Sequence, residues 1–220
     1  MEEEKTNENT SSEENTNDIG QDKEIWGLRI PYSFLDFMQT VAFALVICIV
    51  VYIFIAMPNQ IEGDSMIPNF HNGEIILTSK LSQWLGQTQV GQSLGLDYNR
   101  GDVIVFQKPG FNDFIKRIVG MPKDKIALKE GYVYINGEKL NETYLPNGLL
   151  TKGGDFIENN GEEKPIPDGR YFVMGDNRND SHDSRYLDIG FISHDWLKGK
   201  VIVRYWPLDK ITGIQTPSYK

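Results

Sequence analysis

The clearest feature of the hydrophobic pattern is one long uncharged stretch near the N-terminus. Residues 37–60 contain no charged side chain, and their centre, VAFALVICIVVYIFIAM, is apolar almost throughout. As a helix rising about 1.5 Å per residue, the stretch would span roughly 36 Å, enough to cross a bilayer. A cleaved secretory signal is the alternative, but the apolar run is longer than a signal requires and no clear small-residue cleavage site closes it. The pattern therefore predicts an uncleaved transmembrane helix over residues 37–60.

From residue 61 onwards the pattern changes to short β-branched and aromatic runs separated by Gly, Pro, Asn and Asp. The expected strands are residues 74–78, 103–107, 114–119, 171–174 and 201–206. Residues 125–140 contain Gly131 and the type I′ hairpin signal Asn136-Gly137, which together predict a three-stranded meander. Residues 141–170 are rich in Asn, Gly, Pro and Glu, and we expect a long surface excursion there. The region 61–220 is thus expected to be mainly β.

Charge is concentrated at the N-terminal end. The chain has 31 acidic and 22 basic side chains, and residues 1–24 alone carry nine acidic side chains against Lys5 and Lys23. Such a segment cannot bury enough apolar area to offset the entropy of ordering, so residues 1–36 are expected to form a disordered acidic tail. The net charge of -9 also counts against a nucleic-acid partner, which needs clustered Lys and Arg.

Basic residues near the apolar stretch indicate its orientation. Lys23 and Arg29 precede it, whereas no Lys or Arg lies between Met57 and Ser79. Because positive residues favour the cytoplasmic side of a span, we expect a cytoplasmic N-terminus and an extracytoplasmic β domain in the cell membrane. The single cysteine, Cys48, excludes an intramolecular disulfide and a thiolate zinc site.

Two features of the β domain could carry nucleophilic chemistry. The turn Gly63-Asp64-Ser65-Met66-Ile67-Pro68 makes Ser65 a candidate nucleophile, although serine in such a turn is commonly a turn residue. Strand alternation places Lys116 on the same face as Phe114 and Ile118. This lysine could be a desolvated general base, or its amine could reach solvent along a half-exposed strand.

A third feature is the polar loop at residues 175–185, after the expected strand 171–174. Its Asp, Asn and Arg side chains predict Asx turns and carboxylate-guanidinium pairs. A Ca²⁺ site or a His182/Asp183 metal site is disfavoured because Arg178 stands where an oxygen ligand would be needed and no Glu closes the loop. No histidine lies in a zinc or Ser-His-Asp motif, so no metal and no cofactor are expected.

Four segments of the β domain stand out when they are taken together in chain order. They are Gly63-Asp64-Ser65-Met66-x-Pro68, Gly101-Asp102-Val103-Ile104-Val105, Phe114-Ile115-Lys116-Arg117-x-Val119-Gly120 and Gly175-Asp176-Asn177-Arg178-x-x-Ser181-x-Asp183-Ser184-Arg185. Behind a single N-terminal span, this series resembles the bacterial type I signal peptidases, and the Gly-Asp-Ser-Met form is most similar to Gram-positive members.

The resemblance implies a serine endopeptidase with a Ser-Lys dyad. Ser65 would be the acylating nucleophile, Lys116 the general base, and Ser181 would orient the Lys116 amine by a hydrogen bond. The Ser65 backbone N–H would stabilise the oxyanion, and a second donor is in doubt because Gly63 stands where some members have serine. The residues that would support the site are Gly63, Arg117, Asp176, Asp183 and Arg185, with Asp176 paired to Arg117.

The resemblance also implies a fold and a substrate. The fold would be a mainly β catalytic domain of coiled antiparallel sheets, with an apolar surface at the lipid bilayer. The substrate would be the cleavage region of an exported preprotein, added as a strand along the site, with small residues at the first and third positions before the cut. The substrate-binding residues would be Ile61, Met66, Phe70, Asp113, Phe114 and Ile115, with core packing as the alternative for each side chain.

Two other functions compete with this one. A self-cleaving repressor uses the same dyad, but it is cytosolic and binds DNA, which the apolar span and the acidic charge oppose. An inactive membrane-anchored β domain that binds preproteins or assembly partners is opposed by the joint presence of Ser65, Lys116 and Ser181. The sequence thus predicts a membrane-bound signal peptidase with residues 61–220 as its catalytic domain.

Overall fold

The computed structural model of the chain describes residues 23–25, 28–30, 32–217 and 219. These divide into two compact units whose boundary lies between Ile49 and Val50. In the first unit, β1 (Lys23–Ile25) pairs antiparallel with β2 (Leu28–Ile30), and α1 (Tyr32–Val50) follows. Most of the segment expected to be disordered, residues 1–22, lies outside the described residues.

Two N-terminal boundaries differ from the prediction. β1 and β2 occupy part of the expected disordered tail, because the dense acidic composition ends at Glu24 and apolar residues follow it. The helix begins at Tyr32 and not at residue 37, because residues 32–37 are apolar apart from Ser33 and Asp36.

Helix α1 has the length and composition of a membrane span. Its window Ser33–Val50 has a mean hydropathy of 2.1, and none of that window is buried within the protein. An apolar helix without a protein partner exposes its side chains on all faces, which water disfavours and lipid accepts. Among the described residues, it is the one helix long and apolar enough to cross a membrane.

The helical stretch also ends earlier than expected. Val51–Ile55 form the short π-helix η1, and Ala56–Gln60 form strand β3, although these last residues were assigned to the span. Pro58 explains the difference, because proline inside a helix removes a hydrogen bond and clashes with the preceding turn. β3 is an edge strand, where a sheet tolerates proline, and it pairs with β4 from Ala56↔Ser79 to Gln60↔Ile75.

The second unit is built around one large antiparallel sheet. Its strand order is β12-β11-β6-β5-β13-β4-β3, and β14 pairs with β13. Besides β3, its members are β4 (Ile75–Ser79), β5 (Val103–Gln107), β6 (Asp113–Gly120), β11 (Arg170–Met174), β12 (Ile192–Ser193), β13 (Leu197–Trp206) and β14 (Thr212–Gly213). These strands confirm the mainly β prediction and contain the five expected runs almost completely.

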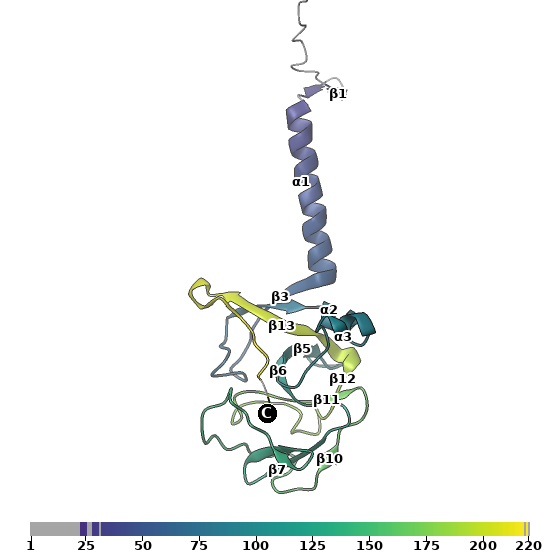
Figure 1. Ribbon diagram of the computed structural model, residues 1–220. Helices are drawn as coiled ribbons and strands as arrows, with labels where there is room; N and C mark the ends of the chain where they lie inside the picture. The colour runs from purple at the N-terminus through teal and green to yellow at the C-terminus, as the bar shows by residue number, and fades with distance from the viewer. Residues whose placement is uncertain (1–22, 26–27, 31, 218, 220) are drawn as a thin grey trace, which may run out of the picture. The chain divides into compact units, whose positions relative to one another are not determined.

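A smaller sheet has the strand order β10-β7-β8-β9. Its strands are β7 (Lys125–Lys129), β8 (Tyr132–Ile135), β9 (Glu138–Lys139) and β10 (Lys164–Pro165). Asn136 and Gly137 both have positive φ, at 54° and 85°, as a type I′ turn requires. The predicted meander over residues 125–140 is therefore confirmed. Within the second unit, β7 and β10 lie at the end opposite β3 and β13 (Figure 1).

Short helices complete the second unit. They are α2 (Leu81–Leu85), α3 (Gln89–Ser93), η2 (His194–Trp196) and η3 (Leu208–Lys210). Several large apolar side chains on and near them are exposed to solvent, among them Trp84, Val90, Leu94, Trp206 and Leu208.

The prediction of a simple surface excursion at residues 141–170 is wrong in part. Thr151, Ile157 and Ile166 are buried, and Ile157 and Ile166 belong to the apolar cluster beneath the smaller sheet. The apolar residues of this segment are sparse and show no periodicity, so the pattern did not predict their packing. Each one contacts the sheet separately and not along a continuous face. The excursion therefore contributes to the core and, as shown below, to the candidate active site.

Candidate active site

The turn that carries Ser65 is anchored by its apolar neighbours. Met66 and Phe70 are almost completely buried in the cluster formed with β4, β5 and β13. Burying side chains of this size contributes about 1.5–3 kcal/mol each, which fixes the backbone of the turn. Gly63 has a φ of +85°, a conformation that favours glycine, and its N–H donates to Asn72 Oδ1. Ser65 itself stays partly exposed.

A second anchor comes from the polar loop after β11. The Asn177 N–H donates to the Ser65 carbonyl at 3.0 Å, and Asn177 Nδ2 donates to the Asp64 carbonyl at 3.1 Å. Among the residues that the structure describes, no hydrogen bond uses the Ser65 N–H. The carbonyls of the turn are thus held while this N–H stays available to a ligand.

Strand β6 brings Lys116 to this serine. Lys116 Nζ lies 2.7 Å from Ser65 Oγ and 3.0 Å from the Ile115 carbonyl. The lysine is only 3% exposed, and its Nζ lies 5.6 Å from the centre of the Phe114 ring. The expectation of a lysine in an apolar setting is confirmed, and the alternative of an amine that reaches solvent is wrong.

Burial changes the protonation of this amine. Removal of Lys116 from water is the largest effect and lowers its pKa to about 8, while Asp183 and Asp176 oppose the shift and Arg185 adds to it. A neutral amine is therefore accessible slightly above neutral pH. A neutral amine at hydrogen-bond distance from a serine hydroxyl can accept its proton.

Ser181 lies beside the dyad, but the hydrogen bond expected between its hydroxyl and Lys116 is not made. Its Oγ is buried and has no partner among the described residues. The amine is instead directed to Ser65 Oγ and the Ile115 carbonyl. Gly175 allows the close packing here, because a Cβ at that position would lie 2.1 Å from Ser181 Oγ and 2.4 Å from the Ser65 carbonyl oxygen.

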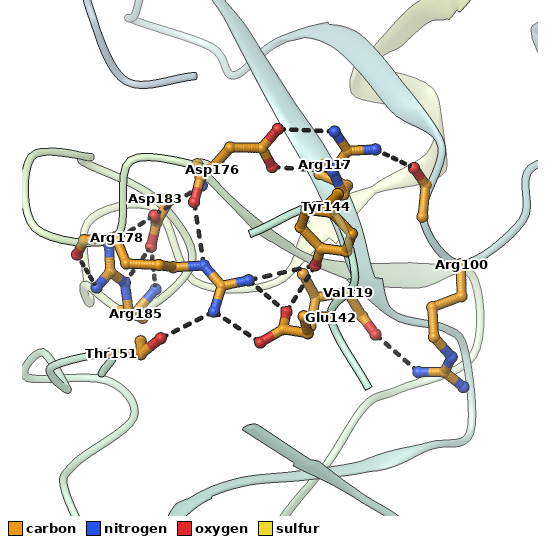
Figure 2. Close-up of polar contacts among 12 residues, drawn as sticks. Arg100, Arg117, Val119, Glu142, Tyr144, Thr151, Asp176, Arg178, Asp183 and Arg185 are labelled. Atoms are coloured by element: carbon orange, nitrogen blue, oxygen red, sulfur yellow. Dashed lines mark hydrogen bonds and ion pairs between the residues drawn. The ribbon is translucent and has the colours of Figure 1, made fainter. Parts of the chain in front are cut away.

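The expected pair between Arg117 and Asp176 is present and buried (Figure 2). Arg117 Nε and Nη2 donate to the two Asp176 oxygens at 2.8 and 2.7 Å, and Nη1 donates to the Gly101 carbonyl at 2.7 Å. A bidentate pair of this kind is directional as well as strong. It ties β6 to the start of the polar loop.

Asp183 and Arg185 hold the polar loop from within. Asp183 accepts hydrogen bonds from the Gly175 N–H and from Arg185 Nε and Nη2. Arg185 also donates to the carbonyls of Lys152, Arg178 and Ser181. Burial alone would raise the pKa of Asp183, but these donors outweigh it and lower the pKa below its usual value.

Two residues of this site were not expected from the sequence. Glu142 and Tyr144, in the excursion, enclose the buried Arg178 together with Thr151 (Figure 2). The Tyr144 ring also lies over Arg117, with 4.2 Å between its centre and the guanidinium carbon. No pattern pointed to them, because their segment shows no periodicity and its partner cations are far away in sequence.

The expected substrate-binding residues separate into two groups. Ile61, Asp113 and Ile115 line a cleft of about 350 Å³ that also borders β3. Met66 and Phe70 do not line it, because they pack in the core below the turn. Phe114 points to the other face of β6, where it stacks on Phe106 with 5.3 Å between ring centres.

One edge of β6 is open next to the dyad. β5 pairs with β6 from Asp113 to Arg117, but β11 pairs only with residues from Arg117 to Gly120. The Ile118 N–H donates to the Asp102 carbonyl, on the β5 side. Because backbone groups of alternate residues point to opposite edges, those of Asp113 and Ile115 point away from β5, to the edge that β11 leaves open.

The described residues offer no obvious metal site. They contain no cluster of three or more His, Cys, Asp or Glu side chains with the geometry to hold an ion. His182, considered above with Asp183, instead places its Nε2 2.6 Å from Asp188 Oδ2.

Comparison with known proteins places the chain in a family. The family model described as "Signal peptidase, peptidase S26" matches residues 34–206. Signal peptidase IB of Staphylococcus aureus strain Mu50 is 36% identical over 186 residues, covering 80% of this chain and 91% of that protein. Signal peptidase I of Bacillus caldolyticus is 36% identical over 171 residues, covering 73% and 86%.

A crystal structure of a signal peptidase I from Enterococcus faecalis V583 is 27% identical, with a TM-score of 0.37, and covers 47% of this chain and 96% of that one. The sequence matches are the stronger result, because the family model covers most of the chain and the relatives match over most of their own length. The chain therefore belongs to the signal peptidase family, peptidase S26, and is a serine peptidase of the signal peptidase I type.

Proposed function

We propose that this protein removes signal peptides from exported preproteins by a Ser65-Lys116 dyad and an acyl-enzyme. The observation that carries the proposal is the 2.7 Å distance between Lys116 Nζ and Ser65 Oγ, with the lysine buried. Buried lysine is costly, and it is retained where a neutral amine is useful.

The acylation half-reaction follows from this contact. The neutral Lys116 amine accepts the Ser65 proton while Oγ attacks the scissile carbonyl carbon, and the Ser65 N–H stabilises the resulting oxyanion. The tetrahedral intermediate then collapses, the C–N bond breaks, and the Lys116 ammonium gives its proton to the leaving amine. The mature N-terminus departs and the signal peptide stays esterified to Ser65.

Deacylation uses the same base. Lys116, neutral again, accepts a proton from a water molecule that attacks the ester carbonyl. Collapse of the second tetrahedral intermediate releases the signal peptide as a carboxylic acid, which loses its proton to solvent, and the Lys116 proton returns to Ser65 Oγ. Ser181, buried beside the dyad without a hydrogen-bond partner among the described residues, would orient the amine during this cycle.

The open edge of β6 supports a substrate bound as an added strand. The backbone groups of Asp113 and Ile115 would pair with the residues before the cut, and the cleft lined by Ile61 and Ile115 would receive a side chain from them. The small residues expected before the cut suit a segment that must lie close to the strand backbone.

The apolar helix supports anchoring in the cell membrane. Lys23 and Arg29 before α1 favour a cytoplasmic N-terminus, so the catalytic domain would be extracytoplasmic. The exposed apolar side chains of α2, α3 and the end of β13 are suited to contact with the bilayer surface. The catalytic domain in this proposal begins with β3, at Ala56.

The proposal is tested by cleavage of a synthetic preprotein peptide by three single variants. Ser65→Ala and Lys116→Arg should be inactive, since the first lacks the nucleophile and a guanidinium keeps its proton near neutrality. Ser181→Ala should lose only about 10²-fold, because it affects orientation. Cleavage by Ser65→Ala at the wild-type rate would remove Ser65 as the nucleophile, and the dyad assignment with it.

A further inference from the structure

The backbone pairing between β6 and β11 ends at Arg117, the residue next to the catalytic lysine. Met174↔Arg117 is the last pair between β11 and β6, so Lys116 is the first residue of β6 without a neighbour on that edge. The same open edge that admits a substrate therefore leaves the base held from one side only. A lysine that must stay within hydrogen-bond distance of Ser65 needs another restraint.

That restraint is the side chain of Arg117. Successive side chains leave a strand on opposite faces, so Lys116 faces the dyad and Arg117 faces the opposite side. The Arg117 guanidinium is fixed in its plane by Asp176 and the Gly101 carbonyl. Its face is covered by the Tyr144 ring, with 4.2 Å between the ring centre and the guanidinium carbon. A cation-π contact is stronger when it is removed from water, as it is here.

Tyr144 joins this strand to the other two parts of the site. Its hydroxyl accepts a hydrogen bond from Arg178 Nη2 at 3.2 Å and donates to Glu142 Oε1 at 2.6 Å. Arg178 Nε in turn donates to the Gly175 carbonyl, beside Ser181. The Tyr144 carbonyl accepts from Asn69 Nδ2, four residues after the nucleophile.

We propose that Tyr144 is a positioning residue for catalysis, whose ring holds Arg117 and thereby keeps Lys116 against Ser65. This inference rests on the proposed dyad. Tyr144 touches neither the nucleophile nor the base, and it acts through Arg117. Burial raises the pKa of Tyr144 well above its ordinary value, so the hydroxyl stays protonated and the ring stays neutral.

Loss of the ring should change the protonation of the base as well as its position. A loosened Arg117 neutralises Asp176 less well, and water enters behind β6. Asp176 and Asp183 both raise the pKa of Lys116, Arg185 lowers it, and burial lowers it most. Weaker neutralisation and weaker burial therefore act in the same direction, and the pKa of Lys116 should rise.

The experiment compares full-length Tyr144→Leu, Tyr144→Phe and Tyr134→Leu on a preprotein peptide between pH 6 and 10. Tyr134 is the matched control, because its ring on β8 also contacts a lysine, Lys129, at 5.5 Å, outside the active site. Tyr144→Leu should lower kcat about tenfold, leave KM within about twofold, and move the acidic limb of the kcat profile upward by roughly half a pH unit. Tyr144→Phe should keep the acidic limb at the wild-type pH. Tyr134→Leu should match the wild-type kcat, KM and pH profile.

Fluorinated phenylalanines at position 144 keep the shape of the ring and weaken its attraction for a cation stepwise, so they test the proposal even if Tyr144→Leu does not fold. With each added fluorine, we expect kcat to fall and the acidic limb of its pH profile to move to higher pH. An unchanged limb across the series, with Ser65→Ala still inactive, would overturn the role of Tyr144 and leave the dyad in place. An active Ser65→Ala would instead remove the proposed function.

Discussion

At the scale of the residue, Lys116 shows a conflict between function and stability. A lysine that is 3% exposed and lies next to Phe114 has a pKa lowered to about 8, against an ordinary value of 10.5. The unfolded chain therefore binds the proton more tightly than the folded chain. In the linkage relation, this difference makes the unfolding free energy rise with pH between about pH 8 and 10.5, and burial of Lys116 destabilises the fold below that window.

Lys116→Met should consequently be inactive and more stable. The gain at pH 7 should be on the order of 3 kcal/mol, and it should shrink to about 0.4 kcal/mol at pH 10.5, where the folded wild-type lysine is neutral and the unfolded one is half protonated. Urea unfolding at pH 7 and at pH 10.5 measures both values. Lys125→Met, at an exposed position of β7, is the control and should change little. An equally stable Lys116→Met at pH 7 would contradict the lowered pKa.

At the scale of the element, β6 has a different role at each end. Its second half, from Arg117 to Gly120, pairs with β11, and the buried Ile118 also exchanges backbone hydrogen bonds with Gly101 and Asp102, just before β5. Its first half, from Asp113 to Lys116, is paired on one edge only, and the backbone groups of Asp113 and Ile115 face the open side. In the proposed function, one strand thus holds the base in the core and presents a free edge to an extended peptide.

This geometry predicts a period of two in the response to substrate N-methylation. A methyl group on an amide that pairs with β6 removes a hydrogen bond and blocks close approach of the strands, so it should lower kcat/KM by about tenfold or more. Methylation of the neighbouring amide, which points away, should have a much smaller effect. A set of peptides methylated one by one before the cut measures this alternation. Equal losses at every position would exclude an added strand.

At the scale of the whole molecule, the proposed catalytic domain begins at β3, six residues after the boundary between the two compact units. Ser65 follows the end of η1 by ten residues, so even an extended connection keeps the nucleophile within roughly 35 Å of that helix end. The Lys80 N–H donates to the Ile55 carbonyl, and β3 covers the outer edge of β4. The helix therefore continues directly into an edge strand of the catalytic sheet.

Two truncated proteins test this boundary. A protein that begins at Ala56 keeps β3, and we expect it to fold and to cleave free peptide at close to the full-length rate. A protein that begins at Ile61 lacks β3 and exposes the edge of β4, so its Tm should be several degrees lower.

The same Ala56 protein should be much less efficient than the full-length enzyme on a preprotein in liposomes, because it lacks the effective concentration that anchoring provides. If its activity fell equally on the free peptide and on the liposome preprotein, the span would have to contribute to the active site itself.

The sequence by itself determined the elements whose physical signal is local. The uncharged stretch predicted a span because a helix in lipid must be apolar on all sides, and alternating runs and Asn136-Gly137 predicted strands and a type I′ turn. Lys116 was placed in an apolar setting by strand alternation alone. The four motifs, taken together, were sufficient for the family and for the candidate dyad.

Only the tertiary structure decided which distant groups meet. Pro58 made an edge strand of a segment whose composition continues the span, because a strand partner existed in β4. Glu142 and Tyr144 carried no local pattern, and their importance comes from two buried guanidinium groups that arrive from β6 and from the polar loop. Hydrogen bonds and cation-π contacts between segments far apart in the chain depend on how the sheets pack, and periodicity does not encode them.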